Sequence, residues 1–269
     1  MNFGKQATTV AQLEAELSAT QAELERLKKE LRKEADVKLK HQAALIDKLA
    51  KSRFSLGIKS TQIIWEILDW DGDYKVTRTY KGLHVGEGLE LHFLKHRAFS
   101  STPNSKFGSA RLLPDKSSAG ISMEFGLEGN ATMFFKIDFP PGLANTESGA
   151  DYGFEYGVEK GLLMTREAAR EAYGSDPRPR EAVYQINEIF NEFLHLELIF
   201  PAGYPGKTNC AALIDQIEHA EETARLQITK TDRGVSVEVS NPLPGFWYLI
   251  EWDGPPEEEF QRLREEMGN

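Results

Sequence analysis

Three histidines, His84, His92 and His96, lie close together in the sequence and are interspersed with Glu87 and Glu90. Imidazole and carboxylate groups bind zinc, but a zinc site needs three protein ligands that converge on one point. On an extended strand, His92 and His96 face the same side but lie two pleats apart, too far for a tight pair without a bend. The three histidines are therefore candidate metal ligands, although their spacing favours surface or interface positions.

Asp69, Asp71 and Asp73 have the spacing of the first ligands of a calcium-binding loop. The twelfth position of such a loop would be Tyr80, which cannot replace the bidentate glutamate of a calcium site. Asp71-Gly72 also stands between two runs of alternating residues, and this pattern is typical of a β-hairpin turn. The sequence therefore predicts a hairpin at these aspartates.

The segment from Pro201 to Thr208 ends in Gly-Lys-Thr, as phosphate-binding loops do. Pro201 stands where such a loop has its first glycine, and Pro205 removes an amide that would contact phosphate. A Gly/Pro turn with Thr208 as the N-cap of a following helix fits the segment better. Cys210 has no visible activating neighbour. We therefore predict no catalytic residue, no cofactor and no bound metal.

Residues 1–57 are predicted to form one long amphipathic helix that serves as a coiled-coil stalk. Its apolar residues recur at alternating spacings of three and four, which is the pattern of a heptad seam. The seam consists of Val10, Leu13, Leu17, Leu24, Leu27 and Leu31, and it resumes at Ile46 and Leu49 after a stutter. A helix of this length is unstable alone in water, so we expect self-association or pairing with another protein.

The charge of the chain is uneven, with a net charge of −10 overall. Residues 1–60 carry 12 Lys and Arg against 8 Asp and Glu, whereas residues 61–269 carry 20 against 34. An acidic body binds phosphate backbones poorly, so the charge disfavours a nucleic-acid partner. Residues 26–59 hold a net charge of +7, which a solvated helix face explains, with a nucleic-acid or anionic-membrane contact as the alternative.

From about residue 62 the apolar period changes to two, which predicts strands. Further strands are expected at roughly 89–95, 121–127 and 132–139. Tyr184 can be laid over Trp65, and residues 247–252 resemble residues 134–139. These offsets of 119 and 113 residues predict a degenerate tandem repeat of two antiparallel β-sandwich-like blocks.

The predicted fold class is mainly β with an N-terminal long α-helix. The expected parts are a coiled-coil helix over 1–57, β block 1 over 60–143, a linker with a short helix from Thr165 to Tyr173 over 144–179, β block 2 over 180–256, and an acidic tail over 257–269. Block 2 is expected to contain one helix, at about 209–224. The tail carries Phe260, Leu263 and Met267 at helical spacing among acidic residues, which fits either a short docking helix or a frayed end.

These features predict a non-catalytic oligomeric binding or scaffold protein, in which the coiled coil sets assembly and the β blocks bind a protein partner. Trp70, Tyr204 and Phe246 are candidate exposed contacts. One alternative is a regulatory subunit of a signalling or defence assembly that pairs its helix with another protein. A second is a metal-dependent enzyme on a β-sandwich. The single cysteine and the absence of a signal segment or of 18 consecutive apolar residues indicate a cytoplasmic protein without a membrane span.

Overall fold

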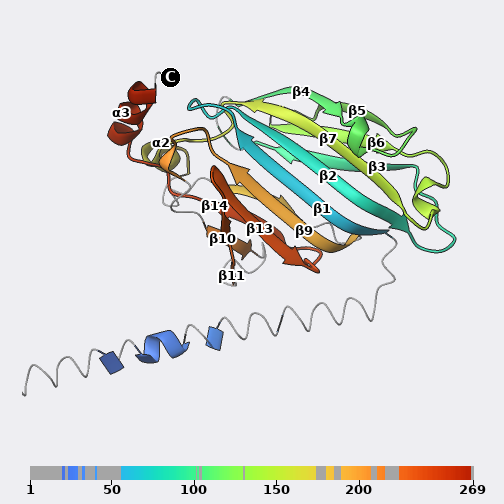
Figure 1. Ribbon diagram of the computed structural model, residues 1–269, viewed down its shortest axis with the longest axis horizontal. Helices are drawn as coiled ribbons and strands as arrows, with labels where there is room; N and C mark the ends of the chain where they lie inside the picture. Colours follow the sequence, from blue (N-terminus) through green and yellow to red (C-terminus); the bar gives the residue numbers. More distant parts are fainter. Residues whose placement is uncertain are drawn as a thin grey trace, which may run out of the picture. The chain divides into compact units, whose positions relative to one another are not determined.

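The computed structural model describes residues 20–21, 24–29, 32–33, 40, 56–100, 102, 105–129, 131–173, 180–184, 189–206, 211–215 and 224–267. The chain divides into two compact units, Met1–Lys51 and Ser52–Asn269. Strands dominate the second unit, whose described α-helices are α2 (Arg166–Tyr173) and α3 (Glu257–Met267) (Figure 1). None of the described helices is long and apolar enough to span a bilayer.

The prediction of a long coiled-coil stalk in the first unit is wrong. The longest described helical stretch there is short and covers residues 24–29. Leu24 and Leu27, two residues of the predicted seam, are 51% and 43% exposed. A leucine row favours a long helix only where a second helix buries it. The other seam residues, Val10, Leu13, Leu17, Leu31, Ile46 and Leu49, lie outside the described residues.

A seven-stranded sheet forms the centre of the second unit, in the order β12-β13-β9-β1-β2-β7-β4 (Figure 1). Neighbouring strands are antiparallel except β1 and β9, which run parallel. The strands of this sheet are β1 (Leu56–Ile67), β2 (Tyr74–Val85), β4 (Lys106–Leu112), β7 (Ala150–Glu159), β9 (Ile189–Ile199), β12 (Thr229–Lys230) and β13 (Gly234–Ser240).

Two smaller antiparallel sheets accompany the large one. A three-stranded sheet has the order β3-β6-β5, and a four-stranded sheet has the order β11-β10-β14-β8. Their strands are β3 (Phe93–Phe99), β5 (Ser122–Leu127), β6 (Thr132–Asp138), β8 (Arg180–Tyr184), β10 (Ala211–Asp215), β11 (Ala224–Leu226) and β14 (Trp247–Glu251). Short 3-10 turns, η1 (Pro114–Lys116) and η2 (Leu143–Asn145), lie in the connections.

The main core lies between the large sheet and the three-stranded sheet. Strand β6 alternates buried and half-exposed residues, so Met133, Phe135 and Ile137 share one fully buried face. The Phe135 ring lies 4.8 Å from the Phe154 ring and 4.9 Å from the Tyr156 ring, both on β7. The two sheets therefore pack face to face through aromatic rings.

The hairpin predicted at Asp71-Gly72 is confirmed. β1 and β2 pair antiparallel along their length, from Leu56 opposite Val85 to Ile67 opposite Tyr74. Gly72 has φ +85°, and a Cβ there would collide with the Leu162 carbonyl oxygen. Only glycine fits this turn, because any other residue would be strained at this positive φ and its Cβ atom would collide with the carbonyl oxygen.

The prediction of two separate antiparallel blocks related by a tandem repeat is wrong. The parallel pair β1 and β9 joins both halves of the chain in one mixed sheet, with Trp65 opposite Leu198. Tyr184, which the predicted repeat equates with Trp65, belongs to β8 in the four-stranded sheet. Period-two alternation identifies strands, but it carries no information on which strands become neighbours.

Two further segments differ from the sequence expectations. Strand β7 lies within residues 144–179, which the sequence assigned to a linker. Ala211–Asp215 forms strand β10 in place of the helix expected at about 209–224. A short apolar run fits a strand and a buried helix equally well, because periodicity alone does not separate them. The short helix expected from Thr165 to Tyr173 is confirmed as α2.

Candidate functional site

The three candidate metal ligands do not form one site in the structure. His96 is buried on β3, where its Nε2 lies 3.0 Å from the Tyr152 hydroxyl. His84 Nδ1 lies 3.1 Å from the Gly82 carbonyl oxygen, and His92 is exposed beside Glu90. Within the described ranges, no group of three or more His, Cys, Asp or Glu side chains is arranged to hold a metal ion.

His96 instead belongs to a buried polar cluster between the two packed sheets. It stacks on Tyr80 with the rings 4.9 Å apart, and Tyr80 stacks on Tyr152 at 4.6 Å. Arg78 lies in the same core and its Nη2 donates a hydrogen bond of 3.1 Å to the Tyr156 hydroxyl. Burial and then the charge of Arg78 lower the pKa of His96 to about 3. His96 is therefore neutral and enclosed, which suits a core residue and not a proton-transfer group.

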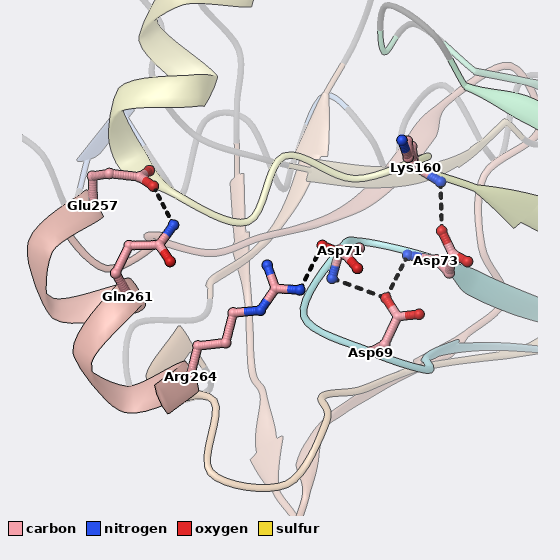
Figure 2. Close-up of polar contacts among 7 residues, drawn as sticks. All are labelled: Asp69, Asp71, Asp73, Lys160, Glu257, Gln261 and Arg264. Carbon is pink, nitrogen blue, oxygen red and sulfur yellow. Dashed lines mark hydrogen bonds and ion pairs between the residues drawn. The ribbon is translucent and has the colours of Figure 1, made fainter. Parts of the chain in front are cut away.

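The aspartate turn of residues 69–73 is closed by its own backbone and by α3 (Figure 2). Asp69 Oδ1 accepts hydrogen bonds from the backbone N–H groups of Asp71 and Asp73, at 2.9 and 3.1 Å. Asp73 Oδ1 accepts one from the backbone N–H of Lys160 at 2.7 Å, and Arg264 Nη2 lies 2.9 Å from Asp71 Oδ1. Because each carboxylate has a different donor, the three do not converge as calcium ligands.

The described part of the loop, from Pro201 to Gly206, packs into the core. Tyr204 is buried, and its hydroxyl donates a hydrogen bond of 2.7 Å to the Met164 carbonyl oxygen. The next described element is strand β10, whereas a phosphate-binding loop leads into a helix. The residues that completed the resemblance, Lys207 and Thr208, lie outside the described residues, as does Cys210.

The three aromatic residues expected to be exposed contacts are all buried. Trp70, Tyr204 and Phe246 are 2%, 2% and 5% exposed. The Trp70 ring lies 5.7 Å from the Tyr204 ring and 5.2 Å from the Phe260 ring of α3. Trp70 and Tyr204 therefore belong to the core that holds α3, and Phe246 is buried as well.

The exposed apolar side chains of the second unit gather around the three-stranded sheet. Five of the seven large exposed apolar residues described there fall between residues 89 and 127, namely Leu89 (45%), Phe93 (53%), Phe99 (64%), Phe125 (45%) and Leu127 (60%); the other two are Leu68 and Met267. An exposed apolar patch is informative because single-chain proteins rarely leave one uncovered without a function.

Charged residues cover the outer face of this sheet. Glu128 accepts hydrogen bonds from Lys95 and from Arg97, and these donors lower its pKa. Lys136 lies 2.8 Å from Asp138 and also sits over the Phe93 ring, 5.6 Å from its centroid. Phe93 and Phe99 of β3 lie on this outer face among the charged pairs, whereas Phe125 and Leu127 of β5 lie on the opposite face.

The edge strand β5 carries the clearest apolar surface. Phe125 and Leu127 lie opposite Phe135 and Met133 of β6, and so face the core side of the sheet. Among the described strands β5 pairs only with β6, so one edge of β5 has no hydrogen-bonded partner strand, although β4 lies close to it. Phe107 of β4, the outermost strand of the large sheet, faces the same core and is half-buried. We call Phe107, Phe125 and Leu127 the β5 opening.

The sequence identifies β5 as a strand but not as an edge. Residues 121–127 are predicted as a strand, and the structure confirms Ser122–Leu127. The alternation places Phe125 and Leu127 on one face, which indicates core positions. Only the strand order shows that no neighbouring strand covers them, since edge position follows from long-range pairing.

Comparisons with known proteins yield distant structural neighbours only. No known protein family and no curated protein sequence matches the chain. Solved structures that match part of the chain include a putative protease from Parabacteroides distasonis, at 11% identity and TM-score 0.37 over 75% of this chain and 41% of that chain. Yeast LTA4 hydrolase in complex with bestatin matches at 8% identity and TM-score 0.37, over 74% of this chain and 29% of that chain.

Legionella pneumophila aminopeptidase A in complex with aspartic acid matches at 10% identity and TM-score 0.30, over 74% of this chain and 22% of that chain. The chain thus spans less than half of the length of each of these proteins. At such low identity and TM-score, the likeness gives no basis for assigning an activity to this chain.

Proposed function

We propose that this chain is a non-catalytic binding module whose β body docks a protein partner at the β5 opening. The observation that carries the proposal is the exposure of Phe125 and Leu127, 45% and 60%, on the core-facing side of an edge strand. Edge strands with an apolar flank readily accept a further strand from another chain. The partner would therefore contribute an extended segment that pairs with β5.

The side chains of β5 define the chemistry of that segment. Residues that alternate along an added strand would face Phe125 and Leu127, so they should be apolar. Residues on the other face would lie beside Glu124, whose side chain is 71% exposed and lies 3.6 Å from Lys136. Basic residues there would complement Glu124 and the acidic charge of residues 61–269. The partner is thus a protein segment that alternates apolar and basic residues, and the cytoplasm is the proposed location.

A phage-displayed library of random 12-residue peptides, selected on the full chain, tests the proposal. We expect enriched peptides to alternate apolar and basic residues, and a bound peptide to slow hydrogen exchange at the β5 amides. Leu127→Lys should abolish binding, while the unfolding temperature changes little because Leu127 is largely exposed. Leu68→Lys is the matched control, since Leu68 is 54% exposed in the β1–β2 turn and outside the opening.

Two results would contradict the proposal. In the first, no peptide is enriched above a selection on an unrelated protein. In the second, peptides bind but protect amides outside β5, or bind Leu127→Lys as tightly as the native chain. Either outcome would show that the exposed apolar residues of β5 do not receive an extended segment.

A further inference from the structure

Helix α3 rests on residues from three segments that are far apart in the sequence. These are the β1–β2 turn, helix α2 and the loop after β9. The contacts join Phe260 to Trp70, Arg264 to Asp71, Glu257 to Glu167 and Met267 to Gly203. Figure 2 shows how Arg264 reaches from α3 to Asp71 in the turn. We call Trp70, Asp71, Glu167 and Gly203 the α3 seat.

Few side chains hold α3 on this seat. Of the α3 residues, all of which the structure describes, Phe260 alone is buried. The side chains of Arg264 and Asp71 are 29% and 57% exposed, and a partly exposed ion pair contributes little to stability. A helix of 11 residues is also marginal by itself in water. The helix can therefore leave its seat while the β body stays folded, as locally unfolding elements do.

The seat keeps its shape without α3. The Tyr204 ring lies 5.7 Å from the Trp70 ring, and its hydroxyl donates a hydrogen bond to the Met164 carbonyl oxygen. The turn that carries Trp70 is closed by Asp69, which accepts hydrogen bonds from two backbone N–H groups of the same turn. These bonds do not involve α3. Release of the helix therefore uncovers a preformed apolar surface around Trp70, and a preformed surface binds without the cost of ordering it.

The charge of α3 disfavours its own binding to the body. The helix carries five glutamates and two arginines, a net charge of −3. Residues 61–256, which carry the seat, hold 18 Lys and Arg against 29 Asp and Glu. Glu265 and Glu266 also stand in the last turn of the helix, where the macrodipole disfavours negative charge. A helix with the same seat contacts but basic residues outside them should bind more tightly than α3.

We propose that the α3 seat binds an amphipathic helix of another protein, and that α3 covers the seat as a replaceable intramolecular ligand. The incoming helix places an aromatic ring against Trp70 and, four positions later, an arginine beside Asp71, as α3 does. Its remaining exposed residues are basic, which complements the acidic body. The seat shares no residue with the β5 opening and takes a helix instead of a strand, so the inference does not depend on the proposed function.

The probe is a fluorescein-labelled peptide with the sequence of residues 257–267, held helical by a covalent link between the exposed positions 258 and 262. In the full chain, Gln261→Pro breaks α3 at an exposed position and leaves the seat intact. Fluorescence anisotropy should show at least tenfold tighter peptide binding to Gln261→Pro than to the native chain, because the chain's own helix no longer competes. Gln261→Ala, which keeps the helix, is the matched control and should bind the peptide as the native chain does.

Two changes in the peptide test the chemistry of the incoming helix. Phe260→Ala in the peptide should abolish detectable binding to the Gln261→Pro chain, because the ring that packs on Trp70 is lost. Glu265→Lys together with Glu266→Lys should tighten binding at least threefold at low salt and less at high salt. The bound peptide should slow hydrogen exchange at the amides of the β1–β2 turn.

Equal peptide affinities of Gln261→Pro and Gln261→Ala would overturn the proposal, as would binding that survives Phe260→Ala in the peptide. Weaker binding of the lysine-substituted peptide would overturn the basic character of the partner. Loss of the β-sheet circular dichroism signal in Gln261→Pro would show that α3 is a structural part of the body and not a replaceable ligand. Leu127→Lys in the full chain should leave every peptide affinity unchanged, which separates this test from that of the β5 opening.

Discussion

His96 shows how the surroundings of one residue decide its chemistry. Burial between the sheets and the nearby Arg78 guanidinium hold the pKa of His96 at about 3. In the unfolded chain the same imidazole has a pKa near 6.5, so protons bind the unfolded state first. The folded state is therefore stabilised above pH 6.5, and this stabilisation is lost as the pH falls toward 3.

The His96→Phe variant should remove this pH dependence. Each proton taken up only by the unfolded state lowers the free energy of unfolding by about 1.4 kcal/mol per pH unit. Urea unfolding of the native chain between pH 7 and pH 4 should therefore show a steeper loss of stability than His96→Phe, by roughly that slope below pH 6. His92→Phe is the control, because His92 is exposed and should leave the profile of the native chain unchanged. Parallel profiles for the native chain and His96→Phe would refute the assignment.

The burial of His96 could not be predicted from the sequence, and the reason is local. Strand β3 has Phe93 and Phe99 on one face and Leu94, His96 and Ala98 on the other. Both faces contain apolar residues, so alternation does not reveal which face is the core. Lys95 and Arg97 mark the outer face only once their pairing with Glu128 is known.

At the level of elements, helix α3 decides between the two alternatives that the sequence left open for the tail, a short docking helix and a frayed end. Phe260, Leu263 and Met267 recur at helical spacing, and the structure has a helix over Glu257–Met267 with Phe260 buried against Trp70. Strand β10 shows the opposite case, since its five residues are too few for a period to be recognised. A periodic segment must therefore be long enough for its period to be recognised before the sequence can indicate the element.

Phe260→Ala should detach or loosen α3. Removing a buried phenylalanine ring costs about 3–5 kcal/mol, through lost burial and the cavity left against Trp70. Arg264→Ala should cost less than about 1 kcal/mol, because its ion pair with Asp71 is partly exposed to solvent. Urea unfolding followed by circular dichroism measures both changes. Similar small losses for the two variants would mean that Phe260 does not anchor the helix.

At the scale of the whole molecule, the parallel pair β1 and β9 unites the two halves of the body. The strands are far apart in the sequence, with Leu56 opposite Ile189, and no turn connects them directly. Local signals such as the Asp71-Gly72 turn predict hairpins, but a pairing across this distance leaves no local trace. The tandem-repeat hypothesis failed at this point, because it placed each half in its own sandwich.

The body should therefore unfold as one cooperative unit that depends on the β1–β9 seam. Thr61 Oγ1 accepts a buried hydrogen bond of 2.8 Å from Asn191 Nδ2 across this seam. Thr61→Val leaves that amide donor unpaired, which costs roughly 1–3 kcal/mol. Because β7 lies on one side of the seam and β13 on the other, native-state hydrogen exchange should show the same loss of protection in both strands.

Thr77→Val is the control, since Thr77 makes no side-chain hydrogen bond with the described residues and lies on β2, outside the seam. A loss confined to β7 or to β13 would show that the halves unfold independently, and the shared sheet would then not couple them energetically.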